Sequence, residues 1–314
     1  MTVKRDLAIG ALLACGVALL PFTVQSGAVL NAVILTLFAA LLGQAWNVLA
    51  GFGGQFSFGH AVFFGTGAYA SAVLQIRFGV NAWAALALAV VAGAAVGAII
   101  GVLTFRYQLR GSYFALVTLA FAEVFRILAN TFPFTGAGVG MMLPLSKAAA
   151  LQFPSRTGYL YLVLALVGVG FAVHLWLSHS RYGAWLAAVR DNEQSAAALG
   201  VDVFRVKLRA IVISAALMAS GGVFYLQYLH YIDPGIAYGP TISVEALLGP
   251  IVGGLGTVFG PLLGAVALHA LSESTRNLLG DTPGVSLALY GVVLILMVRY
   301  MPQGLAGLLA RRKR

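Results

Sequence analysis

The sequence predicts an all-α polytopic transmembrane helical bundle of about ten spans, in one membrane domain that covers residues 1–314. Apolar residues make up 61% of the chain and charged residues only 9%, whereas a soluble globule carries roughly 25% charged residues. The mean hydropathy is +0.94. From Leu7 to Ile76 there is a run of 70 residues without Asp, Glu, Lys or Arg. Because a membrane-spanning helix needs about 20 apolar residues, that run alone can hold three spans.

The apolar runs place the spans in order along the chain. We expect them at about 7–25, 28–50, 57–76, 80–105, 111–130, 158–178, 209–229, 244–258, 260–276 and 284–300. The first resembles a signal peptide, but no A-x-A site follows it, so we expect an uncleaved first span. The pair within 244–276 is the weakest assignment, because one long span there would move the C-terminus to the other side.

The basic residues orient these spans. The net charge is +10, and the Lys and Arg residues form short clusters between apolar runs, which argues against a nucleic-acid-binding face. Ten spans put fourteen of the nineteen basic residues on the side of the termini and four on the other side, while Arg126 falls within a span. Because positive charge gathers in cytoplasmic loops, we expect both termini in the cytoplasm.

Two glycine-rich segments interrupt the apolar runs. One is Gly51–His60, and the other runs from Gly249 to Gly264. Interrupted segments at corresponding places in two halves point to an inverted repeat with a route between the halves. The alternative is close helix packing, because Gly93, Gly97 and Gly101 are also spaced for backbone approach.

Two polar segments lie between spans. Residues 131–157 are rich in Pro and Gly and form an expected outer loop, and residues 179–209 form the longest expected cytoplasmic segment. Within the latter, Asp191 is placed to cap a two-turn helix with Gln194 three residues on, and Gly200 to end it in a left-handed conformation. This helix is either a docking element for a second protein or an ordinary loop helix.

The sequence contains no motif for nucleotide binding, metal binding or enzymatic catalysis. No G-x-x-x-x-G-K-[ST] motif occurs, so we expect no nucleotide or other cofactor on this chain. The five histidines show no metal spacing, and no catalytic triad or carboxylate pair can be assigned, so we do not expect an enzyme.

Charged and polar residues in apolar surroundings are costly to bury and are candidates for a water-filled route. Glu123 and Arg126 share a helix face and could pair there, either along such a route or at the outer interface. Glu245 opens the eighth expected span, where it either favours the positive end of the helix dipole or contacts a substrate. The full candidate set is Gln55, Ser57, His60, Tyr113, Glu123, Arg126 and Glu245.

Four motifs together resemble the LivM-type permeases of branched-chain amino acid ABC transporters. They are Gly54–Tyr69, Leu109–Glu123, the pair Arg181–Ala184 with Val189–Gly200, and Leu248–Pro261. The resemblance covers about residues 30–300. It departs at Ser112, where the family pattern leads us to expect an acidic residue.

The resemblance implies an importer subunit in a bacterial plasma membrane. Its implied partners are a LivH-type second permease, two cytoplasmic ATP-binding subunits that use ATP, and a periplasmic or lipid-anchored substrate-binding protein. The implied mechanism is alternating access, and the implied coupling residues are Arg190, Asp191, Asn192, Glu193, Ala196 and Gly200. Alternatives are urea or short-amide cargo on the same architecture, a proton-coupled carrier that uses Glu123 and Arg126, or a passive channel.

Overall fold

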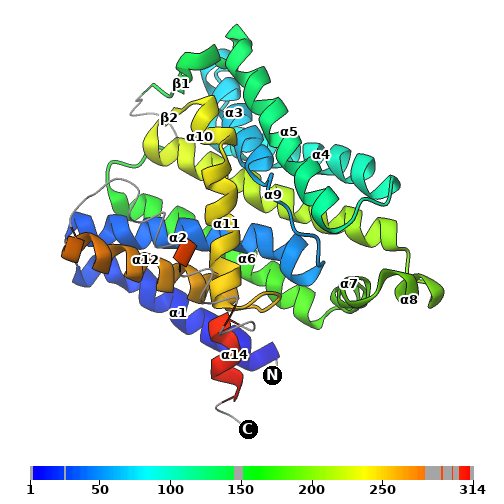
Figure 1. Ribbon diagram of the computed structural model, residues 1–314. Coiled ribbons are helices and arrows are strands. Elements are labelled where there is room, and N and C mark those ends of the chain that lie inside the picture. The colour runs from blue at the N-terminus through cyan, green and yellow to red at the C-terminus, as the bar shows by residue number, and fades with distance from the viewer. Residues whose placement is uncertain are drawn as a thin grey trace.

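The computed structural model describes residues 3–24, 26–144, 151–279, 291–292, 299 and 304–311. The described helices form an all-α bundle (Figure 1). In chain order the helices are α1 Val3–Thr23, α2 Gly27–Asn47, α3 Ala61–Phe78, α4 Ala82–Arg106, α5 Gly111–Thr131, α6 Arg156–His179, α7 Arg181–Asp191, α8 Glu193–Ala198, α9 Val203–Leu229, α10 Pro234–Tyr238, α11 Pro240–Gly253, α12 Gly260–Leu279 and α14 Gly304–Arg311. A π-helical turn, η1 Val48–Phe52, continues α2.

Six of the described helices are long and apolar enough to cross a membrane: α1, α2 with η1, α4, α5, α6 and α9. The shorter α11 is also apolar. The predicted first nine spans coincide with α1, α2, α3, α4, α5, α6, α9, α11 and α12. The tenth, 284–300, lies outside the described residues apart from three isolated positions.

The helix α9 is the centre of the packing. It contacts α2, α3, α4 and α6, and joins the group of α3 and α4 to the group of α2, α6, α11 and α12. Small residues allow its backbone to approach α4 closely, because a Cβ added at Gly93, Gly97 or Gly101 would lie within 2.6 Å of a side-chain atom of α9. These three glycines therefore have the packing role that the sequence offered as an alternative.

The described part of the expected outer loop 131–157 contains short regular elements. It holds the 3-10 turns η2 Pro133–Thr135 and η3 Ala137–Val139 and the strand β1 Met141–Met142. The strand pairs antiparallel with β2 Tyr231–Ile232, with Met141 opposite Ile232. The segment that follows α9 thus holds this loop against the end of the bundle.

The two ends of the described chain lie at the same end of the bundle as α7 and α8. Along α6, Gly10 of α1 contacts the ring of Phe171, and the Tyr161 hydroxyl donates to the Ala18 carbonyl oxygen. The N-terminus of α1 therefore lies near the end of α6 from which α7 continues. The helix α14 begins beside Gly254, since a Cβ at Gly304 would meet the Gly254 nitrogen at 2.5 Å.

Candidate functional site

The first glycine-rich segment is a genuine break between two helices. After η1 the chain is non-helical until α3 begins at residue 61, later than the predicted 57. Gly54 adopts a φ of 68°, a region that suits glycine. The Trp46 indole donates to the Ser57 carbonyl oxygen at 2.8 Å, so a buried side chain satisfies backbone that a helix would otherwise pair.

The second glycine-rich segment breaks between α11 and α12 and meets the first one. The Asn47 side chain joins them: its Oδ1 accepts from the Gly256 N–H at 2.9 Å, and its Nδ2 donates to the Thr257 carbonyl oxygen at 3.2 Å. Gly51 lies in the same contact, because a Cβ there would meet Asn47 Oδ1 at 1.9 Å and the Gly256 nitrogen at 2.5 Å. We call this contact the break junction.

The break junction shows how the two segments are oriented. Gly43 of α2 lies beside Pro250 of α11, and further along both helices Gly51 lies beside Gly256. The C-terminal ends of α2 and α11 therefore both lie at the junction. The inverted repeat of the two halves stays a prediction.

The segment 179–209 contains two short helices and the start of α9, and it extends away from the bundle at α7 and α8 (Figure 1). The predicted cap at Asp191 is wrong. Asp191 is the last residue of α7, and Asn192 caps α8, with its extended backbone and its Oδ1 accepting from the Ser195 N–H at 2.9 Å. Gly200 is left-handed as predicted, with a φ of 87°.

The corrected cap leads to a measurable expectation. Replacing Asn192 by Ala removes an N-cap bond worth about 1 kcal/mol, so the amides of residues 195–199 should exchange about fivefold faster with deuterium. Asp191→Ala serves as the matched control, because its carboxylate only pairs with Arg190 at the surface. Equal acceleration in both variants, measured by exchange mass spectrometry, would contradict the assignment.

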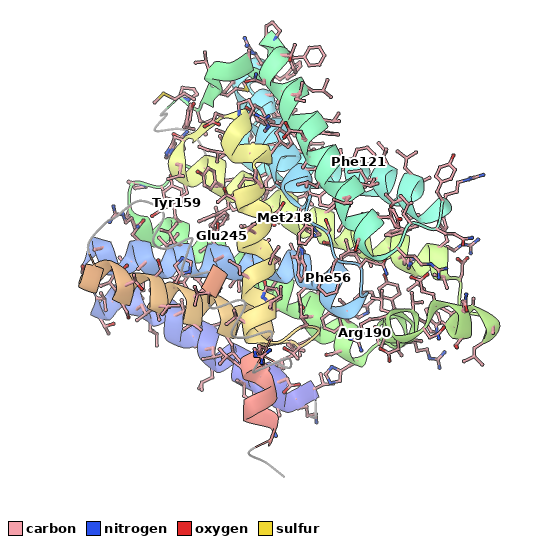
Figure 2. All side chains as sticks on the ribbon, in the orientation of Figure 1. Phe56, Phe121, Tyr159, Arg190, Met218 and Glu245 are labelled. Atoms are coloured by element: carbon pink, nitrogen blue, oxygen red, sulfur yellow. The ribbon has the colours of Figure 1, made fainter. Side chains whose placement is uncertain are left out.

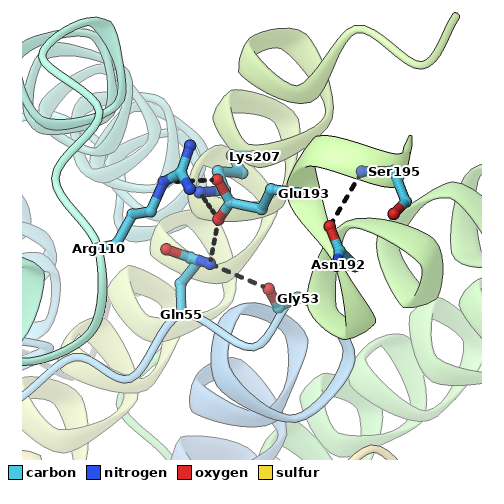
Figure 3. A network of polar contacts seen from close by, with 7 residues as sticks. All are labelled: Gly53, Gln55, Arg110, Asn192, Glu193, Ser195 and Lys207. Atoms are coloured by element: carbon cyan, nitrogen blue, oxygen red, sulfur yellow. Dashed lines mark hydrogen bonds and ion pairs between the residues drawn. The ribbon is translucent and has the colours of Figure 1, made fainter. Parts of the chain in front are cut away.

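Glu193 lies at the centre of a polar cluster that sequence reasoning did not foresee (Figure 3). The family resemblance implied a coupling role for Glu193, but it did not identify the side chains that contact it. The Glu193 Oε2 pairs with the Arg110 Nε at 2.9 Å, and its Oε1 pairs with the Lys207 ammonium and accepts from Gln55 Nε2 at 3.5 Å. The side chains of Glu193 and Lys207 are only 14% and 4% exposed. We call these four residues the Glu193 cluster.

The Glu193 cluster connects α8 to three other parts of the fold. Arg110 precedes α5, Lys207 is in the first turns of α9, and Gln55 lies in the break after η1. Gln55 Nε2 also lies 3.4 Å from the Gly53 carbonyl oxygen, so the side chain holds its own loop as well. The helix α8 is therefore in direct contact with the first glycine-rich segment.

Arg190 makes a second connection from the same segment. Its Nη1 donates to the Gly51 carbonyl oxygen at 3.1 Å. The same nitrogen would lie 3.1 Å from a Cβ added at Gly256. Arg190 at the end of α7 thus holds the break junction itself, while its Nε pairs with Asp191 at 3.2 Å.

Ser57 and His60 are fully buried within the fold. Ser57 Oγ accepts from the Gly59 N–H at 3.3 Å. His60 Nε2 lies 2.8 Å from Ser214 Oγ, and the Ser214 hydroxyl donates to the Ala45 carbonyl oxygen at 2.7 Å. Because that hydroxyl has one proton, His60 Nε2 is the donor to Ser214. The two residues hold the break against α2 and α9, and the surface of the break carries Phe56 and Phe58, which are 42% and 46% exposed.

The candidates on α5 lie on its outer face. Arg126 and Glu123 form a two-point pair, with Nε to Oε2 at 2.8 Å and Nη2 to Oε1 at 2.5 Å. The predicted pair is therefore present, and with 39% and 51% of its side chains exposed it points away from the core of this chain. Tyr113, on the same helix, is 74% exposed.

Glu245 lies within α11 rather than at its start, because that helix begins at Pro240. The expected dipole role is therefore wrong, since the dipole acts within the first turn. Its side chain faces a cavity of about 180 Å³ between α2, α11 and α12, which His269 and Ala39 also line. Figure 2 shows Glu245 on α11 and Arg190 on α7. Among the described residues, the lining of this cavity includes no member of the Glu193 cluster.

Sequence reasoning missed Asn47, Arg110 and Lys207, and the exposed Phe56 and Phe58. One signal was available for Lys207: a lysine at the start of a long apolar helix needs a counter-charge. The roles of the other four residues depend on which segments of the chain lie next to one another in the folded structure.

Comparisons with known proteins agree with the motifs. Residues 28–298 match a family described as branched-chain amino acid transport system / permease component. The high-affinity branched-chain amino acid transport system permease protein LivM of Salmonella typhimurium is 32% identical over 97% of this chain and 75% of its own length. The LivM protein of Escherichia coli is also 32% identical over the same shares. The ribose import permease protein RbsC of Escherichia coli is 27% identical over 74% of this chain and 72% of its own length. No solved structure matches the chain significantly.

Proposed function

Because this chain belongs to the family of branched-chain amino acid ABC transport permeases, we propose that it forms half of an importer for these amino acids. A LivH-type permease would supply the other half, two ATP-binding subunits the energy, and a substrate-binding protein the cargo. In this proposal the chain itself holds no nucleotide or other cofactor. It lies in a bacterial inner membrane, with both termini and α7–α8 on the cytoplasmic side. The unequal distribution of Lys and Arg supports this orientation.

One observation carries the proposed mechanism: the exposed α7–α8 segment is hydrogen-bonded to the first glycine-rich segment, Gly51–His60, at two places. Glu193 reaches Gln55, and Arg190 reaches the Gly51 carbonyl oxygen. A partner that closes against α8 would therefore move the non-helical backbone between α2 and α3. ATP would act on this chain only through such differences in contact between two states.

The proposed translocation surface is the uncovered side of α5 together with the break. Phe56, Phe58 and Tyr113 are exposed there, as is the Glu123–Arg126 pair. An ion pair is tolerated in a membrane where it faces protein or water. We propose that the second permease lies across this surface and that the route runs between the two chains.

Reconstituted vesicles test the function. Vesicles that contain both permeases and the ATP-binding subunits should accumulate radioactive leucine only under two conditions. ATP must be present on the side of the membrane that carries the ATP-binding subunits, and the binding protein must be present on the opposite side. A protonophore should leave the uptake unchanged. Uptake that persists without the ATP-binding subunits and collapses with the proton gradient would establish a carrier instead. Ribose and urea, offered in parallel with their own binding proteins, decide between cargo classes.

A further inference from the structure

A groove along α9, separate from the Glu193 cluster, combines a basic end with an apolar end. The basic part has a volume of about 490 Å³ and lies between α7 and the α8–α9 connection, with Arg205 and Arg209 in its wall. The apolar part has a volume of about 330 Å³ and is lined by Leu208, Val212 and Ile213. Arg209 lines both parts, so the two cavities adjoin.

The arrangement follows from helical spacing. Residues 205, 208, 209, 212 and 213 recur every three or four positions and so share one face of α9. From Arg205 to Ile213 this face rises about 12 Å along the helix axis. Charge is thus concentrated at the end of α9 that adjoins α7, and apolar side chains continue from it into the bundle.

Aromatic side chains close the groove. Trp176 and Tyr182 stack with ring centroids 5.3 Å apart, and both line the apolar part. The Tyr182 hydroxyl donates to the Val206 carbonyl oxygen at 2.8 Å, which fixes the ring against α9. Trp185, 44% exposed, lines the basic part. Tryptophan and tyrosine rings are enriched at membrane–water interfaces.

The charges in the groove favour an anion. Asp202 is the acidic residue in its wall, and Arg205 neutralises it at 3.1 Å. Within the part of the chain that the structure describes, Arg209 forms no ion pair. An exposed guanidinium therefore remains at the point where the apolar part begins.

We propose that this groove binds one anionic phospholipid, with its phosphodiester on Arg209 and Arg205 and one acyl chain along Leu208, Val212 and Ile213. A basic pocket between helices at the cytoplasmic face is a suitable site for such a headgroup. The lipid would contact Trp185 of α7 and Val201 beside α8, and so would steady the segment that carries Glu193. The inference rests on the proposed membrane orientation and not on the cargo.

Tryptophan quenching by dibrominated lipids tests the site. The full-length chain carries Trp83→Phe, which removes an exposed tryptophan in the first turn of α4. It is reconstituted in vesicles with dibromo-phosphatidylglycerol or dibromo-phosphatidylcholine. We expect stronger quenching of Trp176 and Trp185 by the anionic lipid. Arg209→Gln should lower that preference about fivefold, and Val212→Phe should lower quenching by filling the apolar part. Arg77→Gln, in the last turn of α3 and outside the groove, is the charge-matched control and should leave the lipid preference unchanged.

Three outcomes would overturn the proposal. Equal quenching by both lipids means that the arginines do not select a headgroup. Displacement by inorganic phosphate alone means a free-anion site without a lipid chain. Unchanged lipid preference in Arg209→Gln, together with lost binding of the ATP-binding subunits, assigns the groove to a protein partner. Because the readout is binding, a failure of leucine uptake would leave it unaffected.

Discussion

Replacing Glu193 by Gln is expected to uncouple ATP hydrolysis from uptake, with at least about a tenfold loss of substrate moved per ATP. The variant leaves the ammonium of Lys207, 4% exposed, without its counter-charge, and it removes the ion pair to Arg110. Breaking one half of a buried pair is far more harmful than losing a surface pair. Uptake and ATPase rate are measured in the same vesicles, together with the amount of inserted protein.

A matched control and a double variant separate coupling from stability. Asp202→Asn removes a carboxylate in the same segment whose partner Arg205 is 74% exposed, so uptake should stay within about twofold. Glu193→Gln combined with Lys207→Met removes both charges, which should restore thermal stability but not uptake per ATP. Full uptake in Glu193→Gln would mean that the cluster does not transmit motion.

Replacing Gly51 by Ala is expected to have the second large effect. The new methyl group would lie 1.9 Å from Asn47 Oδ1 and 2.5 Å from the Gly256 nitrogen, and these two atoms are hydrogen-bonded to each other. The break junction must therefore open or shift. We expect uptake to fall at least about tenfold and the melting temperature of the purified chain to drop, as for other overpacked sites.

The control for Gly51→Ala is Gly168→Ala in α6. A Cβ at Gly168 meets nothing within 4 Å. Exchange of Gly for Ala in a helix usually stabilises it by about 0.5–1 kcal/mol, so this variant should melt no lower than the parent chain. If Gly51→Ala matched the control in both melting temperature and uptake, the close contact at the break junction would be disproved.

The sequence predicted the helices well because long apolar runs have few alternative structures. Nine of the ten expected spans correspond to described helices, and the glycine breaks fall where expected. It located the cap of α8 one residue too early, because Asp191 and Asn192 are both good caps and only the end of α7 decides between them. Such a choice depends on local geometry that composition does not encode.

The candidate site was only partly predictable for a different reason. Glu193 was singled out, but its partners come from residues 55, 110 and 207, which are brought together by the packing of α5 and α9. Likewise, the polar residues of the break point inward and its phenylalanines outward, the reverse of what polarity alone suggests for a lined route. Both features depend on tertiary contacts between distant segments.

The amide of Asn47 binds the backbone of a segment more than two hundred residues further along the chain, and it does so from the last turn of α2. One side chain of the first half is therefore a structural component of the second half. The two halves cannot separate at this end without leaving a peptide N–H and a carbonyl unpaired, so any opening movement there must carry both helix breaks as a unit. A substitution that shifts the backbone of either glycine-rich segment should accordingly disturb the other.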